Sequence, residues 1–412
     1  MRCERDLLTR QSSIYKNIKV KKLVRMNKQT VAINNPFVRS DVYGALAVPV
    51  YNNVAFEFDD AAEMADAFCN RIKAPDYARV ENPTVTNLEQ RVKALTGADH
   101  VTAFNSGMAA ISNTLLAVTA QGWNIVSSHH LFGNTLALIS TTLKRFGVEP
   151  RLRNLTNLEA VTEAIDEKTC AVFLEVVTNP QLEVANLKAI AEIAHKKGVP
   201  VIADSTVIPF TETNLKALGV DVEVVSSTKY LSGGGTSLGG LVIDYGTFPE
   251  INKRVKYELL FNLGAYMTPQ AAYMQTLGLE TLDVRYQRQA GNALWLAQEL
   301  SKVVKVNYVG LENNPYHALA LQQFGPTAGA MFTIDLASKE ACFRFLNRLQ
   351  LVHRATNLFD SRTLAIHPAS TIFGNFPEEQ LAEMDVRQTT IRLSIGLENK
   401  EDILADIKQA LG

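Results

Sequence analysis

Residues 220–240 read Val-Asp-Val-Glu-Val-Val-Ser-Ser-Thr-Lys-Tyr-Leu-Ser-Gly-Gly-Gly-Thr-Ser-Leu-Gly-Gly and decide the organisation of the chain. The β-branched residues Val222, Val224 and Val225 predict a buried strand that delivers Lys229 into a loop. A lysine at the end of an apolar strand is poorly hydrated, which lowers its pKa and leaves a nucleophilic amine. This is what a Schiff-base lysine requires. The alternative is a surface lysine beside a flexible glycine loop.

The surroundings of Lys229 favour a carbonyl cofactor that carries a phosphate. Ser226 and Thr228 supply hydroxyls that can bind phosphate, and the glycines that follow let backbone approach a ligand. Asp204 ends a run of apolar residues, at the end of a strand that could lie beside the strand of Lys229. A carboxylate there can keep a pyridine nitrogen protonated, although a turn residue is the alternative. The sequence therefore predicts pyridoxal phosphate (PLP).

Two further stretches are suited to the phosphate. Residues 104–110 pass from a strand through Gly107 and Met108 into a helix, whose free amides and dipole can cradle an anion. Tyr77 and Arg79 add a hydroxyl and a guanidinium, although a surface arginine is the default alternative.

Asn179 and Arg392 are candidates for the ring and the substrate. Asn179 could donate to the phenolate oxygen of the cofactor, although Asn-Pro is also a common turn. Arg392 lies in an apolar strand, where an unpaired charge is costly. The α-carboxylate of a substrate would be a suitable bidentate partner, as would an internal acid.

Composition excludes several classes of protein. The chain has 412 residues, 47% hydrophobic and 20% charged, which is ordinary for a globular protein with two or three domains. A net charge of −1 argues against a nucleic-acid surface, and no apolar run is long enough to cross a membrane. The four cysteines form no Cys-x-x-Cys pair, so we expect neither a metal site nor disulfides, and a reducing, cytoplasmic setting.

The chain divides into four predicted parts. Residues 1–26 hold eight Lys and Arg against two acids and are interpreted as a poorly ordered leader, with a targeting peptide as the alternative. Residues 27–60 are irregular and predict an N-terminal arm. Residues 61–255 form the large cofactor-binding domain, and residues 256–412 a smaller α+β domain.

Strands and helices alternate through the large domain, which predicts an α/β fold with a mostly parallel sheet covered on both faces. A helix capped by Thr86 and ended by Gly97 comes first. The expected strands are 101–104, 125–127, 171–175, 199–204, 222–226 and 240–244. A helix is expected at 187–197, and the smaller domain should hold helices at 277–303 and 339–349, strands at 330–336 and 391–397, and a last helix capped near Asn399. Ligands bind at the carboxyl ends of such strands.

From about residue 27 to its end, the chain resembles the Cys/Met-metabolism (trans-sulfuration) family of fold-type I PLP enzymes. The motifs that carry the resemblance are Tyr77-x-Arg79 with Asn82-Pro83-Thr84, Ser106-Gly107-Met108-Ala109-Ala110, Asn179-Pro180, Asp204-Ser205-Thr206, Ser226-x-Thr228-Lys229-Tyr230, His367-Pro368-Ala369-Ser370-Thr371 and Arg392-Leu393-Ser394-Ile395-Gly396. The resemblance implies the aspartate aminotransferase-like transferase fold.

The resemblance also implies roles for individual residues. Lys229 would be the Schiff-base and proton-transfer lysine, and Asp204 would pair with the pyridine nitrogen. The phosphate would be held by Gly107, Met108, Ser226 and Thr228, with Tyr77 and Arg79 reaching it from the neighbouring subunit of a homotetramer built from dimers. Arg392 and Thr363 would bind the substrate. Phe132 stands where the family usually has a tyrosine that stacks on the ring. Phenylalanine keeps the stacking but lacks the phenolic proton.

Local features favour one branch of the family. Residues 235–240 resemble the homoserine-ester sulfhydrylases, as does the motif formed by Asn357-Leu358 with residues 363–368. Arg362 stands where cystathionine-handling relatives tend to carry an acid. We therefore predict γ-replacement on an O-acylated homoserine, O-acetylhomoserine before the succinyl ester, with sulfide or a thiol to give homocysteine or methionine. The alternatives are a methionine γ-lyase or cystathionine β- or γ-lyase, an O-succinylhomoserine sulfhydrylase or cystathionine γ-synthase, and a non-catalytic protein that keeps the fold.

Overall fold

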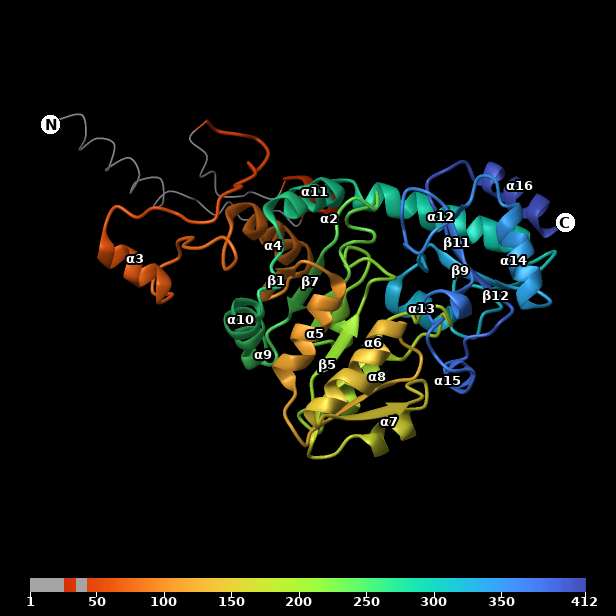
Figure 1. Cartoon of the computed structure of the whole chain (residues 1–412), viewed down its shortest axis with the longest axis horizontal. Helices are drawn as coiled ribbons and strands as arrows, with labels where there is room; N and C mark the ends of the chain where they lie inside the picture. Colours follow the sequence, from red (N-terminus) through yellow and green to blue (C-terminus); the bar gives the residue numbers. More distant parts are fainter. Residues whose placement is uncertain (1–25, 35–42) are drawn as a thin grey trace.

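The computed structural model describes residues 26–34 and 43–412 (Figure 1). The predicted leader at residues 1–26 lies, apart from Met26, outside the described residues. Two sheets organise the rest of the chain, one of seven strands and one of five. The predicted α/β fold is confirmed.

The seven-stranded sheet has the order β1-β7-β6-β5-β4-β2-β3. Its strands are β1 (His100–Phe104), β2 (Asn124–Ser128), β3 (Glu149–Arg153), β4 (Thr169–Glu175), β5 (Val201–Asp204), β6 (Val222–Val225) and β7 (Gly240–Asp244). All neighbours pair in parallel except β7, which runs antiparallel to both β1 and β6. The predicted mostly parallel sheet is therefore confirmed.

Apolar residues on both faces of this sheet are buried. Along β4, Val172 and Leu174 belong to one core while Ala171 and Phe173 belong to the other. This alternation follows from the two-residue period of a strand. The first core packs against α4 (Pro83–Thr96), α7 (Leu158–Ala164), α8 (Leu187–His195), α11 (Pro269–Glu280) and α12 (Leu282–Leu300). The second packs against α5 (Gly107–Val118), α6 (Gly133–Ala137), α9 (Pro249–Arg254) and the neighbouring helical segments η1 (Leu138–Thr142), η2 (Leu143–Phe146) and η4 (Val255–Leu260).

The smaller sheet has the order β10-β11-β12-β9-β8 and lies at the C-terminal end of the molecule (Figure 1). Its strands are β8 (Lys305–Asn307), β9 (Met331–Asp335), β10 (His353–Arg354), β11 (Leu364–Ile366) and β12 (Thr390–Ser394). The helices of this part are α13 (His317–Phe324), α14 (Lys339–Arg348), α15 (Glu378–Glu383) and α16 (Lys400–Leu411), with the short η5 (Pro368–Ser370). Asn399 caps α16 as predicted, because its side chain accepts from the amides of Glu401 and Asp402. The division of the chain at residues 255/256, which falls within η4, stays a prediction.

The predicted N-terminal arm, residues 27–60, carries α2 (Lys28–Asn34), and α3 (Ala61–Phe68) follows directly after it. The segment with α3 stands away from the rest of the molecule (Figure 1). Several of its apolar side chains are open to solvent, with exposed fractions of 93% at Tyr43, 86% at Leu46 and 55% at Phe68. An apolar surface of this kind is typical of a contact with another chain.

The structure corrects three element predictions. Helix α4 begins at Pro83, because Asn82 rather than Thr86 caps it, although Gly97 ends it in the left-handed conformation as expected. The strand β3 was not predicted, because an edge strand with charged residues lacks an apolar pattern. The single helix expected at 277–303 is two helices, α11 and α12, which meet at Thr281.

The remaining short helices are η3 (Leu215–Leu218) and α10 (Phe261–Leu263). None of the helices in the described part of the chain combines the length and the apolar character that crossing a membrane requires.

Candidate active site

A cavity of about 340 Å³ opens at the carboxyl ends of the central strands of the large sheet. Its wall comes from the ends of β4, β5 and β6, from the first turn of α5, and from the small domain around Thr356 and Arg392. Nine of the residues predicted from the sequence line it: Gly107, Met108, Phe132, Asn179, Asp204, Ser226, Thr228, Lys229 and Arg392. The fold therefore brings together residues that are up to 285 positions apart in the chain.

The sheet register places two carboxylates side by side. Glu175 ends β4 and lies opposite Asp204, which ends β5, and β5 pairs in turn with β6, the strand that leads to Lys229. Burial raises the pKa of Asp204. Burial, together with the neighbouring charge of Asp204, raises the pKa of Glu175 well above its usual range. A cationic group in the cavity would relieve this repulsion.

The backbone at the start of α5 is suited to an anion. Ser106 caps the helix by accepting from the amide of Ala109 at 3.1 Å, so Gly107 and Met108 stand in the first turn, where amides lack intrahelical partners. A Cβ on Gly107 would lie 2.6 Å from the Cβ of Ser226. Only glycine therefore lets this helix start and the loop after β6 form one concave surface.

The two predicted hydroxyl ligands differ in their surroundings. The amide of Ser226 donates to the hydroxyl of Thr206 at 2.8 Å, which fixes the backbone of the loop. The hydroxyl of Thr228 is bonded to Gly239, donating to its carbonyl at 3.2 Å and accepting from its amide at 3.0 Å. Thr228 would have to redirect its hydrogen to bind a phosphate.

Lys229 has the chemistry expected from its position. Burial, reinforced by the positive charge of Arg392, lowers the pKa of its amine from 10.5 to about 8. The amine donates to the side-chain oxygen of Asn357 at 2.9 Å. Roughly a tenth of Lys229 is thus neutral at pH 7, far more than of an ordinary lysine, and the neutral form is what a nucleophile or a general base must have.

Arg392 is a buried cation that pairs with no carboxylate of the described residues. Burial lowers its pKa from 12.5 to about 9. One of its terminal nitrogens donates to the side-chain oxygen of Asn179 at 3.1 Å, whereas its Nε is buried and finds no acceptor within residues 26–34 and 43–412. An anion in the cavity would provide the missing acceptor. The bond from Arg392 also orients the amide of Asn179, so that its nitrogen remains the donor.

Glu175 has a structural role that the sequence did not reveal. Its two oxygens accept the amides of Phe132, at 2.6 Å, and of Asn179, at 3.2 Å. One buried carboxylate thus holds two loops that carry predicted ligands. The only sequence signal was its place at a strand end, beside that of Asp204.

Three predicted site residues do not reach this cavity. Tyr77 is 40% exposed and stacks with Arg79, which donates to the carbonyl of Phe261, so both lie outside the cavity of their own chain. Thr363 is fully buried, and its hydroxyl is bonded to Glu398 and to the amide of Gly396. We therefore correct its assignment, because its side chain stabilises the small domain instead of facing a substrate.

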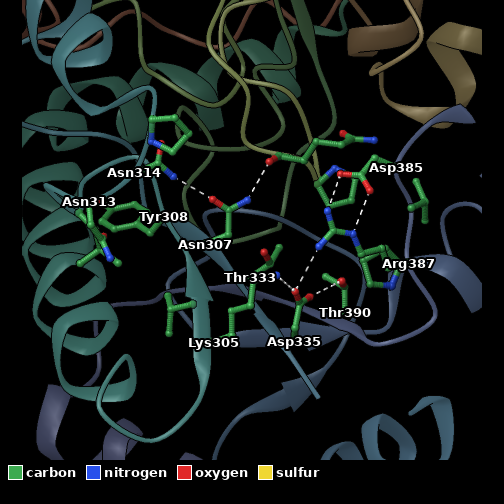
Figure 2. Close-up of a pocket in the computed structure, with 17 residues that line it drawn as sticks. Lys305, Asn307, Tyr308, Asn313, Asn314, Thr333, Asp335, Asp385, Arg387 and Thr390 are labelled. Atoms are coloured by element: carbon green, nitrogen blue, oxygen red, sulfur yellow. Dashed lines mark hydrogen bonds and ion pairs between the residues drawn. The ribbon is translucent and has the colours of Figure 1, made fainter. Parts of the chain in front are cut away.

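A second hollow of about 250 Å³ lies on the small sheet (Figure 2). Its charged side chains are paired with one another: Asp335 bonds Lys305 at 2.8 Å, Arg387 at 3.4 Å and the hydroxyl of Thr390 at 2.7 Å, and Arg387 also binds Asp385. These groups are satisfied without a ligand. Nowhere in residues 26–34 and 43–412 do three or more His, Cys, Asp or Glu side chains gather in a way that could hold a metal ion.

The first cavity fits pyridoxal phosphate. It offers a weakly basic lysine for the aldehyde, a carboxylate at Asp204 for the ring nitrogen, and the concave surface at Gly107 and Ser226 for the phosphate. The Nε of Arg392, which is buried without an acceptor among the described residues, is available to donate to an anionic group of the substrate. This fold and this site define a fold-type I PLP-dependent enzyme.

Comparison with known proteins identifies the family. Residues 29–412 match the model of the Cys/Met metabolism PLP-dependent enzymes, and the chain belongs to this family, with pyridoxal phosphate as its cofactor. It is 38% identical to an L-methionine gamma-lyase of Fusobacterium nucleatum, over 90% of this chain and 94% of the relative. It is 33% identical to an O-acetyl-L-homoserine sulfhydrylase of Corynebacterium glutamicum, over 88% of this chain and 91% of the relative.

A solved structure agrees with this assignment. A Campylobacter jejuni protein provisionally named O-acetylhomoserine (thiol)-lyase superposes with a TM-score of 0.90 at 35% identity, covering 94% of this chain and all of that one. That protein carries an N′-pyridoxyl-lysine-5′-monophosphate residue. The curated relatives include both a replacement enzyme and a lyase, so the family does not by itself identify the reaction.

Proposed function

We propose that the enzyme catalyses γ-replacement on an O-acylated homoserine, with O-acetylhomoserine preferred, using sulfide or a thiol to form homocysteine or methionine. The Cγ–O bond breaks, a Cγ–S bond forms, and the acyl group leaves as a carboxylate. One observation carries the proposal: the cavity wall at position 132 is a phenylalanine. The ionisable residues that line the cavity in the described part of the chain are Glu175, Asp204, Lys229 and Arg392.

These residues favour a leaving group that needs no proton. Glu175 is committed to two backbone amides, and we assign Asp204 to the ring nitrogen and Arg392 to the substrate carboxylate. A carboxylic acid has a pKa of about 4, whereas a thiol has a pKa of about 8.5, so a carboxylate leaves readily without protonation and a thiolate does not. A cavity with phenylalanine at position 132 has no phenol there to protonate a leaving thiolate. It therefore favours an ester substrate, which releases a carboxylate, over a thioether substrate.

The side chains of this chain would act in a defined order. Arg392 binds the α-carboxylate of the amino acid by charge-assisted hydrogen bonds. The neutral amine of Lys229 takes the proton from the α-carbon. Asp204 keeps the ring nitrogen protonated. Pyridoxal phosphate, when bound, supplies the electron sink that stabilises a carbanion at the substrate α-carbon.

Product analysis tests the reaction. The enzyme is incubated with sulfide and either O-acetylhomoserine or O-succinylhomoserine, and separately with methionine or cystathionine alone. We expect homocysteine from an ester at a rate well above the release of 2-oxobutanoate or pyruvate. A Phe132→Tyr variant is the matched control, because it restores the phenol and should raise thioether cleavage.

The second candidate is γ-elimination from methionine, which the 38% identity to a methionine gamma-lyase favours. Rapid 2-oxobutanoate formation from methionine, with little homocysteine from either ester, would establish that activity and reject ours. The preference for the acetyl ester over the succinyl ester rests on likeness to the acetylhomoserine enzyme of Corynebacterium glutamicum.

We also propose that the active enzyme is a homotetramer built from dimers that share their active sites. Tyr77 and Arg79 are cavity ligands in our interpretation, yet they lie outside the cavity of their own chain. The exposed apolar residues of the segment with α3, which stands away from the body (Figure 1), provide the contact surface. A second copy would bury these residues and bring the hydroxyl and the guanidinium to the phosphate.

A further inference from the structure

The amine of Lys229 is held by a residue of the small domain. Lys229 follows β6 of the large sheet, whereas Asn357, whose oxygen accepts from the amine at 2.9 Å, lies between β10 and β11, 128 residues further along the chain. This is the hydrogen bond that the structure gives to the amine. The way the two domains pack therefore decides where the nitrogen of Lys229 points.

The orientation of the Asn357 amide is determined by its other partner. Its nitrogen donates to a carboxylate oxygen of Asp360 at 3.2 Å. Because an ionised carboxylate only accepts, the nitrogen of Asn357 must face Asp360, which leaves its oxygen for Lys229. The amide cannot be reversed without placing two acceptors against each other.

Arg362 keeps Asp360 ionised and in place. It donates to Asp360 from its Nε at 2.8 Å and from a terminal nitrogen at 3.1 Å. Burial opposes the charge on Asp360, but the hydrogen bonds from Arg362 outweigh it, so the pKa of Asp360 lies below its usual value. The charge of Asp360 is thus balanced by Arg362, and the group that Lys229 meets is neutral.

The glycines after Lys229 wrap around this network. Arg362 donates to the carbonyl of Gly234 at 2.9 Å, and Ser361 donates to the carbonyl of Gly233 at 2.8 Å. Gly235 has a positive φ of 65°, and a Cβ there would overlap the carboxylate of Asp360. The loop and the network therefore fit each other closely, which fixes the backbone that follows the lysine.

We infer that Asn357 is a positioning residue that aims the free amine of Lys229, with Asp360 and Arg362 fixing the direction of its amide. A neutral amine has two hydrogens and one lone pair. Donating one hydrogen to a fixed acceptor restricts rotation about the Cε–Nζ bond, so that the lone pair points away from Asn357 and into the cavity. An aspartate at position 357 would also accept, but it would favour the charged amine. The role rests on the proposed function of Lys229 as the base.

The first test measures Lys229 itself in the cofactor-free enzyme. The rate at which trinitrobenzenesulfonate modifies the peptide containing Lys229 is followed against pH by mass spectrometry. Asn357→Asp, which keeps the size and the acceptor, should raise the apparent pKa of Lys229 by about one unit or more. Asn357→Leu should not raise the apparent pKa of Lys229. Asn313→Leu, at an exposed asparagine of the second hollow (Figure 2), is the matched control and should behave as the wild type.

The second test uses the holoenzyme with the substrate that it turns over fastest. Asn357→Leu should lower kcat by about tenfold to a hundredfold with little change in KM, because a misdirected base slows proton removal and not binding. Asn357→Asp should move the acidic limb of the pH profile of kcat to higher pH. Thermal unfolding of each variant checks that it folds.

Two results would overturn the inference. One is an Asn357→Leu enzyme with kcat within twofold of the wild type. The other is an Asn357→Asp enzyme in which the titration of Lys229 and the pH profile are unchanged. Absence of homocysteine from both esters would reject the proposed replacement reaction, but the titration of Lys229 in the cofactor-free protein would still decide the role of Asn357.

Discussion

At the residue scale, the buried amine of Lys229 connects function with stability. The same burial that makes it a base at neutral pH disfavours its charged form in the folded chain, where its pKa falls from 10.5 to about 8. Below pH 8 the folded and unfolded chains both carry the charge, so the folded state bears the full cost of burying it. Between pH 8 and 10.5 the folded chain alone loses the proton, and the cost disappears.

Replacing Lys229 should therefore stabilise the cofactor-free protein. We expect Lys229→Met to raise the free energy of unfolding at pH 7 by up to about 3 kcal/mol, from 1.36 kcal/mol per pKa unit. The gain should decline as the pH rises from 8 to 10.5. Urea unfolding at several pH values measures it. Lys253→Met, at a lysine whose side chain is 70% exposed, should show no gain of this size, and an equal gain there would contradict our explanation.

At the element scale, the contact between α5 and the loop after β6 forms the phosphate end of the cavity. Helix α5 starts at Gly107, which has no side chain and so lets the helix start lie directly against Ser226. The same helix packs on β6 and β7. Since interiors are close-packed, an added methyl group must displace one of these elements.

Gly107→Ala should consequently weaken cofactor binding by tenfold or more while the protein still folds. Equilibrium dialysis with pyridoxal phosphate measures the affinity. Gly291→Ala is the matched control, because a Cβ there meets no atom within 4 Å on an exposed turn of α12. It should leave the affinity unchanged and stabilise the helix by about 0.5–1 kcal/mol. Wild-type affinity in Gly107→Ala would show that the phosphate binds elsewhere.

At the scale of the whole molecule, one proposal explains both the exposed apolar residues near α3 and the position of Tyr77 and Arg79 outside their own cavity. The chain alone leaves apolar side chains in water and leaves a tyrosine and an arginine outside its own cavity. The symmetric dimer that we propose would bury the apolar side chains and would bring the tyrosine and the arginine to the partner's cavity.

Mixing two inactive variants tests this shared site. Arg79→Ala and Lys229→Ala chains are co-refolded or coexpressed. If each cavity takes its lysine from one chain and its arginine from the other, half of the dimers are mixed and one of their two sites is intact. Activity should then return to about a quarter of the wild-type value. Mixtures that stay inactive, or an enzyme that sediments as a monomer with full activity, would refute the shared site.

Much of this site was open to prediction from the sequence, because its central residues stand at the ends of neighbouring strands. Asp204 ends one short apolar strand and Lys229 follows another, and parallel strands present their carboxyl ends at one edge of the sheet. Gly107 and Ser226 were recognisable for the same reason. Local chemistry and regular geometry determine these positions.

Only the tertiary structure could decide the contacts that join the two domains. Asn357 reaches Lys229, and Arg392 bonds Asn179, through packing that no local periodicity encodes. Glu175 was recognisable as an acid at a strand end. Its hydrogen bonds to the amides of Phe132 and Asn179, however, depend on how the two loops fold back toward it. Thr363 was misplaced because a family motif gives a position along the chain and not the direction of a side chain. The sequence alone thus determined the fold and the reacting groups, whereas the tertiary structure decided their orientation, because orientation depends on contacts between residues far apart in the chain.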